Sequence, residues 1–368
     1  MGKYVSWLKW PGPPVSVFPL LLLLLFFICP SSSPGQEYRD VLPEYRVKLP
    51  DDLYYREDFR IQWWYFTGHL STASGRRFGY ELTFFVVGVQ KRKYVSRFGL
   101  NTVVISHFAL SDISEGEYFF SDKADGVAFG FAGASRDRLR VFVGGDRLEG
   151  SMEEFHLEAS AEDRAIDLSL VPGKPYVPNG EGGYSRKSET SPLLASLYFS
   201  NTDMGTAGTV KIADRVFEVT GKSWFDREIS SRAGSEDLAG WDWFAIQLDD
   251  GRDVMLSLLR KSDGSVDRFS SGTIVYRDGT YRILGKGEFS VRALDRYRSR
   301  KTGAWYPSAW EVGIPSENLS LRVTPLMQDQ EFVAPYSTWN HYWEGACRVS
   351  GSAGGRAYVE LTGYSEKK

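Results

Sequence analysis

The chain has 368 residues, of which 42% are hydrophobic and 15% aromatic, a composition that supports a large buried core and excludes a disordered or fibrous protein. Its 44 basic and 47 acidic residues are spread evenly and give a net charge of -3, so no charge field favours nucleic acid or an anionic membrane surface. The length indicates two domains instead of one.

The N-terminal segment, residues 1–35, has the organisation of a secretory signal peptide or an uncleaved signal anchor. Lys3 and Lys9 precede the apolar run 18–29, and a small polar stretch follows it. The run is short for a membrane span. Phe27 and Ile28 are bulky where lipoprotein signals carry small residues, which argues against lipidation at Cys29. We therefore expect export to the periplasm or the extracellular space, with peripheral membrane association through the N-terminus if the segment is retained.

Short runs of alternating or aromatic-rich sequence recur after this segment, and long amphipathic helical periods are scarce. Such runs, bounded by Gly, Asp, Asn or Ser, are typical of β-strands. The clearest examples cover residues 80–89, 101–110, 165–171, 272–284 and 357–364. Two Asp-Gly pairs, at 250–251 and 278–279, are typical of hairpin turns. The sequence therefore predicts a mostly β protein.

An internal repeat indicates two β units. The segment that begins at Trp64 aligns with the segment that begins at Trp243, and each runs from an aromatic strand through a Gly-Arg turn into an apolar strand. The repeat predicts two tandem antiparallel barrels. A leading Trp commonly plugs one end of such a barrel, so packing is an alternative role for these aromatic side chains. We expect an N-terminal domain over residues 36–228, a polar connection over 229–240 and a C-terminal domain over 241–368.

The segment 171–210 is rich in Pro, Gly and Ser, and its early part is too irregular for a strand. We expect a long ordered loop near the domain interface. Long loops in compact domains often carry function, which makes Tyr184, Lys187, Tyr198 and Ser200 candidates for ligand contact. The alternative is that these side chains only fasten the loop.

Acidic residues next to tryptophan are the strongest candidates for chemistry. Trp224 precedes Asp226, Arg227 and Glu228, and Asp242 lies between Trp241 and Trp243. A carboxyl group held against indole rings is poorly solvated, which raises its pKa and suits it to donate a proton, for example to an alkene. The alternative is that residues 226–228 form a solvated turn or a structural ion pair.

Other chemistries have less support in the sequence. It contains no GxSxG, GxxxxGK[ST] or GxGxxG motif, so a serine hydrolase or a nucleotide enzyme lacks evidence. The histidines at 69, 107, 156 and 341 lack the spacing of a metal site, and we expect neither a metal nor a cofactor. Two carboxylates near a cleft would also suit glycoside hydrolysis, with aromatic residues as sugar platforms, and Glu331 and Glu344 join the candidate carboxylates for that reaction. Without the signal segment, Cys347 is left unpaired, which predicts no internal disulfide.

Nine ordered segments carry a family resemblance. They are residues 62–70, 180–189, 196–202, 223–230, 240–260, 303–312, 329–331, 342–346 and 358–364. In these segments the chain resembles the lipocalin-like family of carotenoid 1,2-hydratase (CrtC) and AttH, whose members are often labelled secreted hydrolases. The resemblance covers almost the whole mature chain. It implies two tandem lipocalin-like antiparallel β-barrels, with a ligand cavity near the domain interface.

The resemblance also implies an apolar ligand, isoprenoid or lipid-like. Carotenoid hydratases add water across a terminal isoprenoid double bond without a cofactor, and related members act as hydratases or cyclases on other apolar compounds. Here Arg227 and Ile229 stand where hydratase-like members carry His and Trp, which weakens a carotenoid substrate in particular. Isomerisation and hydrolysis remain open as reactions.

Under this hypothesis, Asp226 or Asp242 is the acid, and Arg227 with Glu228 orders the entrance. Aromatic faces would stabilise a tertiary cation. We expect the ligand to contact Trp64, Tyr184, Lys187, Tyr198, Trp224, Trp241, Trp243, Trp343 and Glu344. The alternative is a non-catalytic carrier of lipid or pigment, because a barrel can bind an apolar ligand without an acid. In a carrier, residues 226–228 would hold the two domains together.

Overall fold

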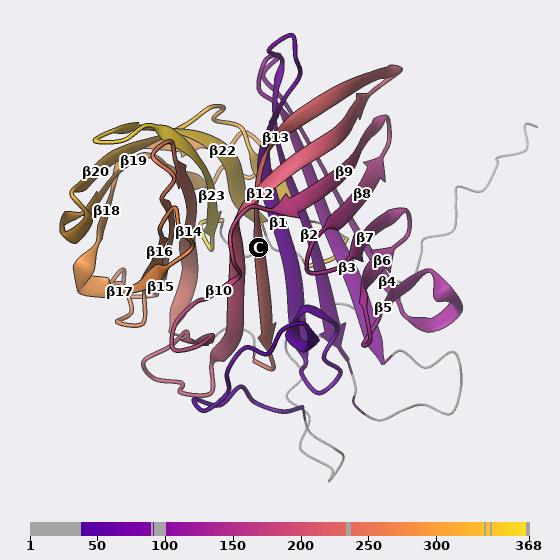
Figure 1. Ribbon diagram of the computed structural model, residues 1–368, viewed down its shortest axis with the longest axis horizontal. Coiled ribbons are helices and arrows are strands. Elements are labelled where there is room, and N and C mark those ends of the chain that lie inside the picture. Colours follow the sequence, from indigo (N-terminus) through magenta and orange to yellow (C-terminus); the bar gives the residue numbers. More distant parts are fainter. Residues whose placement is uncertain are drawn as a thin grey trace, which may run out of the picture. The chain divides into compact units, whose positions relative to one another are not determined.

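Two large antiparallel sheets account for the fold (Figure 1). The computed structural model describes residues 38–89, 91, 101–232, 237–334, 336–338 and 341–365, so the expected signal segment lies outside the described residues. Residues 35–368 form one compact unit. The described residues contain strands and four short 3-10 helices but no α-helix, which confirms the mostly β prediction. None of the helices found there is long and apolar enough to cross a membrane.

The N-terminal sheet has thirteen strands in the order β4-β3-β2-β1-β13-β12-β9-β8-β7-β6-β5, with β10 and β11 paired to β12. It curls into a nearly closed barrel, because β3 and β4 approach β5 and β6. The strands are β1 (Ile61–Ser71), β2 (Arg77–Gly88), β3 (Thr102–Asp112), β4 (Glu117–Gly126), β5 (Ala132–Ala134), β6 (Leu139–Val143), β7 (Asp146–Gly150), β8 (Phe155–Ala161), β9 (Arg164–Pro172), β10 (Val177–Pro178), β11 (Tyr184–Arg186), β12 (Ala195–Ile212) and β13 (Arg215–Ser230).

The C-terminal sheet has ten strands in the order β17-β16-β15-β14-β23-β22-β20-β19-β18, with β21 paired to β22, and forms a half-barrel. Its strands are β14 (Leu238–Leu248), β15 (Asp253–Lys261), β16 (Ser271–Val275), β17 (Tyr281–Gly285), β18 (Ser290–Arg298), β19 (Trp305–Ile314), β20 (Leu319–Pro325), β21 (Glu331–Val333), β22 (His341–Gly351) and β23 (Gly355–Thr362). The 3-10 helices are η1 (Asp51–Leu53), η2 (Ala128–Gly130), η3 (Lys286–Glu288) and η4 (Pro315–Glu317).

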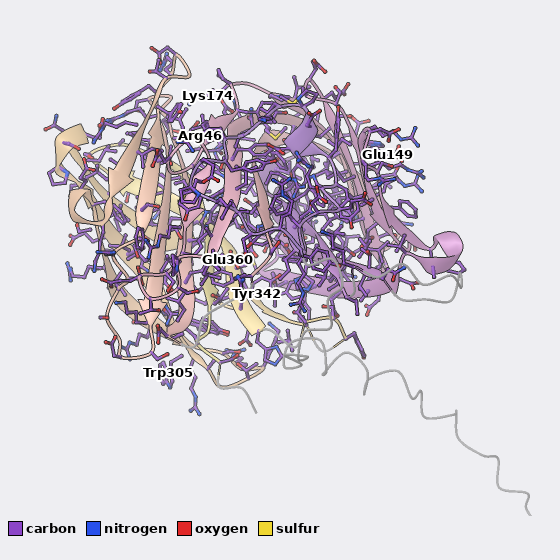
Figure 2. All side chains as sticks on the ribbon, turned by 90° about the horizontal axis from the view of Figure 1, so that it is seen from below. Arg46, Glu149, Lys174, Trp305, Tyr342 and Glu360 are labelled. Carbon is purple, nitrogen blue, oxygen red and sulfur yellow. The ribbon has the colours of Figure 1, made fainter. Side chains whose placement is uncertain are left out.

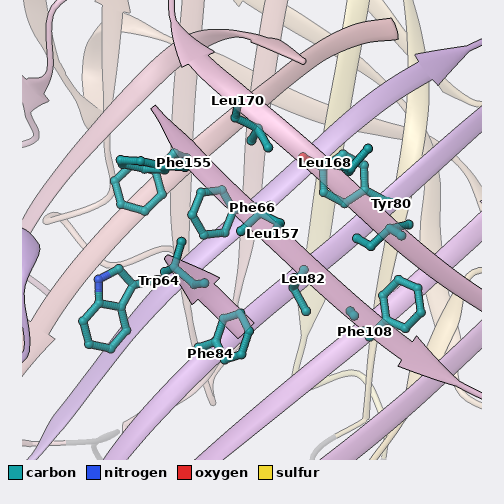
Figure 3. Close-up of a cluster of buried hydrophobic side chains, with 14 of the residues drawn as sticks. Trp64, Phe66, Tyr80, Leu82, Phe84, Phe108, Phe155, Leu157, Leu168 and Leu170 are labelled. Atoms are coloured by element: carbon teal, nitrogen blue, oxygen red, sulfur yellow. The ribbon is translucent and has the colours of Figure 1, made fainter. Parts of the chain in front are cut away.

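Aromatic and aliphatic side chains fill the inside of the N-terminal barrel (Figure 3). Phe66 stacks on Phe225 with ring centroids 4.8 Å apart, and Phe155 meets both rings edge-on. Trp64 closes the cluster, and its indole Nε1 donates to the carbonyl of Leu53 at 2.8 Å. The centre of the barrel is therefore a packed core.

Strand alternation gives the central strands two buried faces. On β1, Trp64 and Phe66 point into the barrel, whereas Tyr65 points out toward the C-terminal sheet. The outward faces of the two sheets pack against each other, and we call these side chains the inter-sheet layer. Its apolar centre consists of Tyr65, Tyr198, Trp224, Trp243, Ala245, Met255, Ala346 and Tyr358.

Polar contacts fix the two sheets at the edges of this layer. His107 Nδ1 lies 2.8 Å from the hydroxyl of Tyr342, and Ser111 donates to Gln330 Oε1 at 2.8 Å. Lys174 forms a buried ion pair with Asp253 at 2.5 Å. Figure 2 shows Lys174 and Tyr342 on opposite sides of the zone where the sheets meet.

Both predicted hairpin turns are confirmed. The 250–251 turn joins β14 to β15, with Gln247 opposite Asp253, and the 278–279 turn joins β16 to β17, with Val275 opposite Tyr281. Gly279 has a φ of +84°, a left-handed conformation that glycine adopts without strain.

The repeated hairpins exist as β1–β2 and β14–β15, but the alignment of their tryptophans is wrong. Trp64 points into the N-terminal barrel, whereas Trp243 points into the inter-sheet layer, and Phe244 takes the barrel-facing position. A shift of one residue along a strand moves every side chain to the other face, so the two tryptophans have different roles.

Gly68 on β1 provides a test of the packing. A Cβ atom there would collide with the ring of Tyr80 and the hydroxyl of Ser223, which are hydrogen-bonded to each other at 2.6 Å across the glycine. We predict that Gly68→Ala lowers the free energy of unfolding by about 1–3 kcal/mol through overpacking. Gly287→Ala, where a Cβ meets nothing within 4 Å, is the matched control. Urea unfolding at equilibrium measures both, and equal stabilities would contradict the packing described.

Candidate functional site

Alternation along β13 selects which acidic residues reach the inter-sheet layer. Trp224, Asp226 and Glu228 share the outward face, whereas Phe225 and Arg227 point the other way. The register places Asp226 between Tyr65 of β1 and Ser200 of β12. The sheet thus carries a carboxyl group into a layer that is otherwise aromatic.

Asp226 is buried and accepts three hydrogen bonds. Trp224 Nε1 donates at 2.7 Å and Ser200 Oγ at 2.5 Å to Oδ1, and the Tyr198 hydroxyl donates at 2.6 Å to Oδ2. Burial raises the pKa of Asp226 to about 7, against the lowering effect of these donors, and the charge of Glu228 adds to the increase. The group can therefore be neutral or ionised near pH 7, as a general acid requires.

Aromatic rings surround this carboxyl group. Trp243 meets Tyr65 edge-on at 5.1 Å and Trp224 edge-on at 6.0 Å between ring centroids. Its Nε1 lies 3.1 Å from the hydroxyl of Tyr198, to which it donates. These rings provide electron-rich faces that can stabilise a cation next to Asp226.

The layer reaches solvent beside Glu228. Lys187 Nζ lies 3.0 Å from Glu228 Oε2 and 4.9 Å from the centroid of the Tyr198 ring. Ser196 also donates to Glu228. Trp241 is 40% exposed at the same edge of the C-terminal sheet. Trp241 and Lys187 are thus more exposed than Asp226, which is 4% exposed.

Glu360 is a second carboxyl group with a shifted pKa in this layer. It lies on β23 between Trp243 of β14 and Glu344 of β22 (Figure 2), and it remains partly exposed. Burial raises its pKa to about 7, and the charges of Glu228 and Asp226 add to this, whereas a hydrogen bond from Trp241 opposes it. Glu360 was not among the site residues expected from the sequence.

Two further carboxyl groups lie deeper. Tyr65 donates to Glu344 Oε1, and burial raises the pKa of Glu344, helped by the nearby charges of Glu81 and Glu360. The pKa of Glu81 is also raised, mainly by burial. Glu81 was not among the residues expected from the sequence. A Glu inside an apolar strand, as in YELTFF for Glu81 and YVELTGY for Glu360, is nevertheless a recognisable sign of a buried carboxyl group.

The void in this layer is small. It has a volume of about 10 Å³ and is bounded by residues that include Thr67, Trp224, Ala245 and Tyr358. That is room for about one water molecule. A larger ligand reaches these side chains only if the two sheets or the aromatic rings move.

Comparisons with known proteins agree with this architecture. Residues 40–364 match the family described as AttH-like. The chain belongs to the AttH-like family. No curated protein sequence matches it at a significant level.

Solved structures show the same fold. The AttH-type protein NE1406 of Nitrosomonas europaea is 32% identical to this AttH-like protein, with 89% of this chain and 100% of that chain covered and a TM-score of 0.82. Kievitone hydratase of Nectria haematococca is 14% identical, with 89% and 96% covered and a TM-score of 0.68. The predicted family and the predicted fold of two lipocalin-like β-barrel domains are thereby confirmed.

Arg227 of this AttH-like protein does not order the entrance, as the sequence analysis expected. It is fully buried on the barrel side of β13, 3.8 Å above the ring of Trp64. Its guanidinium group donates to the carbonyls of Asp52 and Tyr54 and to Gln62 Oε1. The side chain closes one end of the barrel, so its role is structural.

Asp242 also lies outside the inter-sheet layer. It accepts from Arg260 Nε at 2.8 Å and from the Tyr364 hydroxyl at 2.9 Å, on the barrel side of β14. Burial raises its pKa, and Arg260 opposes the increase. Because its neighbours Trp241 and Trp243 point the other way, the structure separates Asp242 from Asp226.

Other expected ligand contacts are structural in this arrangement. Trp64 belongs to the N-terminal core, and Trp343 to the C-terminal core, where its Nε1 donates to Gln328 at 2.7 Å. Tyr184 packs in a separate cluster with Leu197. Of the expected residues, Tyr198, Ser200 and Trp224 donate to Asp226, and Trp243 contacts Tyr198 and Trp224. Lys187 pairs with Glu228. Glu344 accepts from Tyr65, and Trp241 bonds to Glu360, so these two lie beside the group and not on Asp226 itself.

Glu331 and Glu344 do not form a glycoside hydrolase pair with each other. Glu331 accepts hydrogen bonds from Ser299, Thr302 and Tyr306 on the barrel side of the C-terminal sheet. Glu344 points into the inter-sheet layer instead. Two carboxyl groups on opposite faces of a sheet cannot flank one bond.

One surface group has metal-ligating side chains. His156, Glu158 and Asp167 on β8 and β9 have potential ligand atoms within 4.8 Å of one another. The His156 ring already pairs with Asp167 at 2.8 Å, which is sufficient to explain the group. The prediction that the protein uses no metal stays a prediction.

Arg227 yields a stability prediction. Arg227→Met removes the donors of four backbone carbonyls and of Gln62, so the free energy of unfolding should fall by about 3–5 kcal/mol. Arg140→Met, which breaks an exposed pair with Glu149, is the matched control and should change stability by less than about 1 kcal/mol. Urea unfolding compares the two, and equal small effects would exclude the structural role.

The raised pKa values predict a pH dependence of stability. Asp226 and Glu360 have folded-state pKa values of about 7, whereas unfolded carboxyl groups titrate near 4. Between these values the folded state binds more protons, so these groups stabilise the protein most near pH 4, and the contribution is lost as the pH rises to about 7. We predict that Asp226→Asn reduces this slope by up to ~1.4 kcal/mol per pH unit.

Urea unfolding from pH 4.5 to 7.5 measures this slope. Asp278→Asn is the control, because its exposed carboxyl has a lowered pKa and is ionised throughout that range. An unchanged slope in Asp226→Asn would mean that Asp226 is ionised in the folded protein across this pH range.

Proposed function

We propose that this AttH-like protein is a cofactor-free hydratase that adds water to a carbon–carbon double bond of an apolar small molecule bound in the inter-sheet layer. The observation that carries the proposal is the Asp226 carboxyl group, buried among aromatic rings with a pKa of about 7. A purely structural carboxylate is normally paired with a cation, whereas the hydrogen-bond partners of Asp226 are neutral.

The chemistry divides between two carboxyl groups. Neutral Asp226 transfers its proton to one alkene carbon, and the electron pair of the double bond forms the new C–H bond. The faces of Trp224, Trp243 and Tyr65 stabilise the resulting carbocation. Ionised Glu360 accepts a proton from the water that forms the C–O bond. A proton returned from Glu360 to Asp226 through solvent completes the addition of one water molecule.

The charges of the two groups favour this division. Ionisation of Asp226 raises the pKa of Glu360, so a state with one proton shared between the two groups is favoured near neutral pH. Glu360 is the more exposed of the two, which suits the group that receives a proton from water.

The departure from the carotenoid hydratase pattern does not affect this site. Arg227 and Ile229 lie on the barrel side of β13, where Ile229 packs with Val41 and Leu197. Asp226 and Glu228 lie on the opposite face. The substitution at these positions therefore concerns barrel closure, and the substrate class stays open among apolar unsaturated molecules.

A carrier function is the second candidate, supported by a different feature. A hollow of about 390 Å³ at one end of the N-terminal barrel is bounded by Leu110, Asp112, Phe119, Arg164 and Ile212 among others. This volume is in the range of small-ligand pockets. A carrier would hold its ligand there without needing Asp226.

We also propose that the protein is exported, on the basis of residues 1–35, whose composition is that of a secretory signal or signal anchor. Export would restrict the substrate to compounds that reach the periplasm or the cell exterior.

Replacement of the acid distinguishes the two functions. Full-length protein and its Asp226→Asn variant are purified from the native host, and their organic extracts are compared by mass spectrometry. We expect the Asp226→Asn variant to accumulate an unsaturated compound. When this compound is added as substrate, the unchanged protein should hydrate it at least 100-fold faster than the Asp226→Asn variant does. Asp242→Asn is the matched control and should retain turnover. The same unchanged compound on all three proteins would identify a carrier and exclude the hydratase.

A further inference from the structure

Three polar groups in the inter-sheet layer lack a hydrogen-bond partner within the described part of the chain. They are Glu81 Oε2 and the hydroxyl oxygens of Tyr118 and Tyr358. Glu81 is 1% and Tyr358 is 3% exposed, so bulk water does not satisfy them. An unpaired buried polar group typically costs about 1–3 kcal/mol, and several at one place require an explanation.

The strand register brings the three groups together. Gly79, Ser111 and Tyr118 lie in one row across β2, β3 and β4. The Tyr358 ring of β23 covers this row, because a Cβ atom at Gly79 would lie 3.6 Å from its Cε2. Glu81 is the next residue of β2 on the same face. Glu81 and Tyr118 of one sheet and Tyr358 of the other thus lie in one region of the inter-sheet layer.

All three groups are hydrogen-bond donors at neutral pH. Burial raises the pKa of Glu81 well above its usual range, which favours the neutral acid, whose O–H is a donor. Its other oxygen already accepts from Thr83 at 2.5 Å. Burial also raises the pKa of Tyr118 and of Tyr358, and nearby carboxyl groups add to the increase. The cluster therefore offers O–H groups and needs an acceptor.

We propose that Glu81, Tyr118 and Tyr358 form an oxygen-recognition site, in which their O–H groups donate hydrogen bonds to a carbonyl, enol or phenol oxygen of the substrate. The inference rests on the proposed hydratase function and specifies its substrate class. A neutral carboxylic acid beside a tyrosine in an apolar site is suited to binding such an oxygen, because its donors are already oriented and desolvated.

The fold sets the distance between this oxygen and the reacting double bond. Asp226 lies on β13 and Glu81 on β2, with β1 between them. Two strand spacings place the groups on the order of 10 Å apart. The substrate is therefore an oxygenated molecule at least as long as two fused six-membered rings.

Binding of a matched pair of probes tests the site. Equilibrium dialysis measures the dissociation constants of 2-naphthol and naphthalene for the full-length protein at pH 7. Because the layer is closely packed, the incubation continues until the amount of bound probe no longer changes. We expect 2-naphthol to bind at least 10-fold more tightly than naphthalene. In Tyr358→Phe and Glu81→Leu this preference should fall below about 3-fold, with the affinity for naphthalene retained.

Two controls separate this inference from the proposed function. Tyr297→Phe, on β18 at the far edge of the C-terminal sheet, should keep the full preference. Asp226→Asn should also keep the preference for 2-naphthol while losing turnover. Loss of activity and loss of oxygen recognition are therefore measured independently. Thermal unfolding checks that each variant is folded, and Glu81→Gln, which keeps a donor, replaces Glu81→Leu if the latter does not fold.

The other outcomes overturn the proposal. These are no saturable binding of 2-naphthol, an equal affinity for the two probes in the unchanged protein, or an unchanged preference in Tyr358→Phe. Tighter binding of 1-naphthylmethylamine than of 2-naphthol would show that the carboxyl groups are ionised and bind cations instead.

Discussion

The packing of the two outward sheet faces is the constraint on which the rest of this structure depends. Each central strand is buried on both sides, by its own barrel on one side and by the other sheet on the opposite side. Asp226, Glu344 and Glu81 are therefore removed from bulk solvent. The loss of solvation raises their pKa values, so the acid chemistry proposed here follows from the way the sheets meet.

This arrangement favours function over stability. Neutral donors around Asp226 moderate its pKa but do not neutralise it with a cation, and the deeper polar atoms lack partners within the described residues. By contrast, Arg227 is buried with several acceptors and stacks on Trp64. Arg227 and Asp226 are neighbours on β13 and have different roles. Arg227, on the barrel side, stabilises the barrel, whereas Asp226, on the outward side, is a buried carboxyl group without a cationic partner.

Much of the fold could be predicted from sequence, because the relevant information is local. Apolar alternation and Asp-Gly turns located the strands and both hairpins, and the ordered motifs identified the family. The site was only partly accessible. The tryptophan next to Asp226 correctly indicated a desolvated acid. The same pattern also made Asp242 and Arg227 candidates, but in the structure both side chains point away from the inter-sheet layer. Neighbours in sequence on a strand face opposite sides, so proximity along the chain is misleading.

The sequence by itself determined the β architecture, the AttH-like family and the presence of acidic groups among tryptophans. Only the tertiary structure decided which of these groups share one space. Glu81 comes from β2, and Glu344 and Glu360 come from the C-terminal sheet; they share the inter-sheet layer with Asp226 because two sheets pack face to face. The desolvation that gives them raised pKa values depends on that long-range contact, which strand periodicity does not encode.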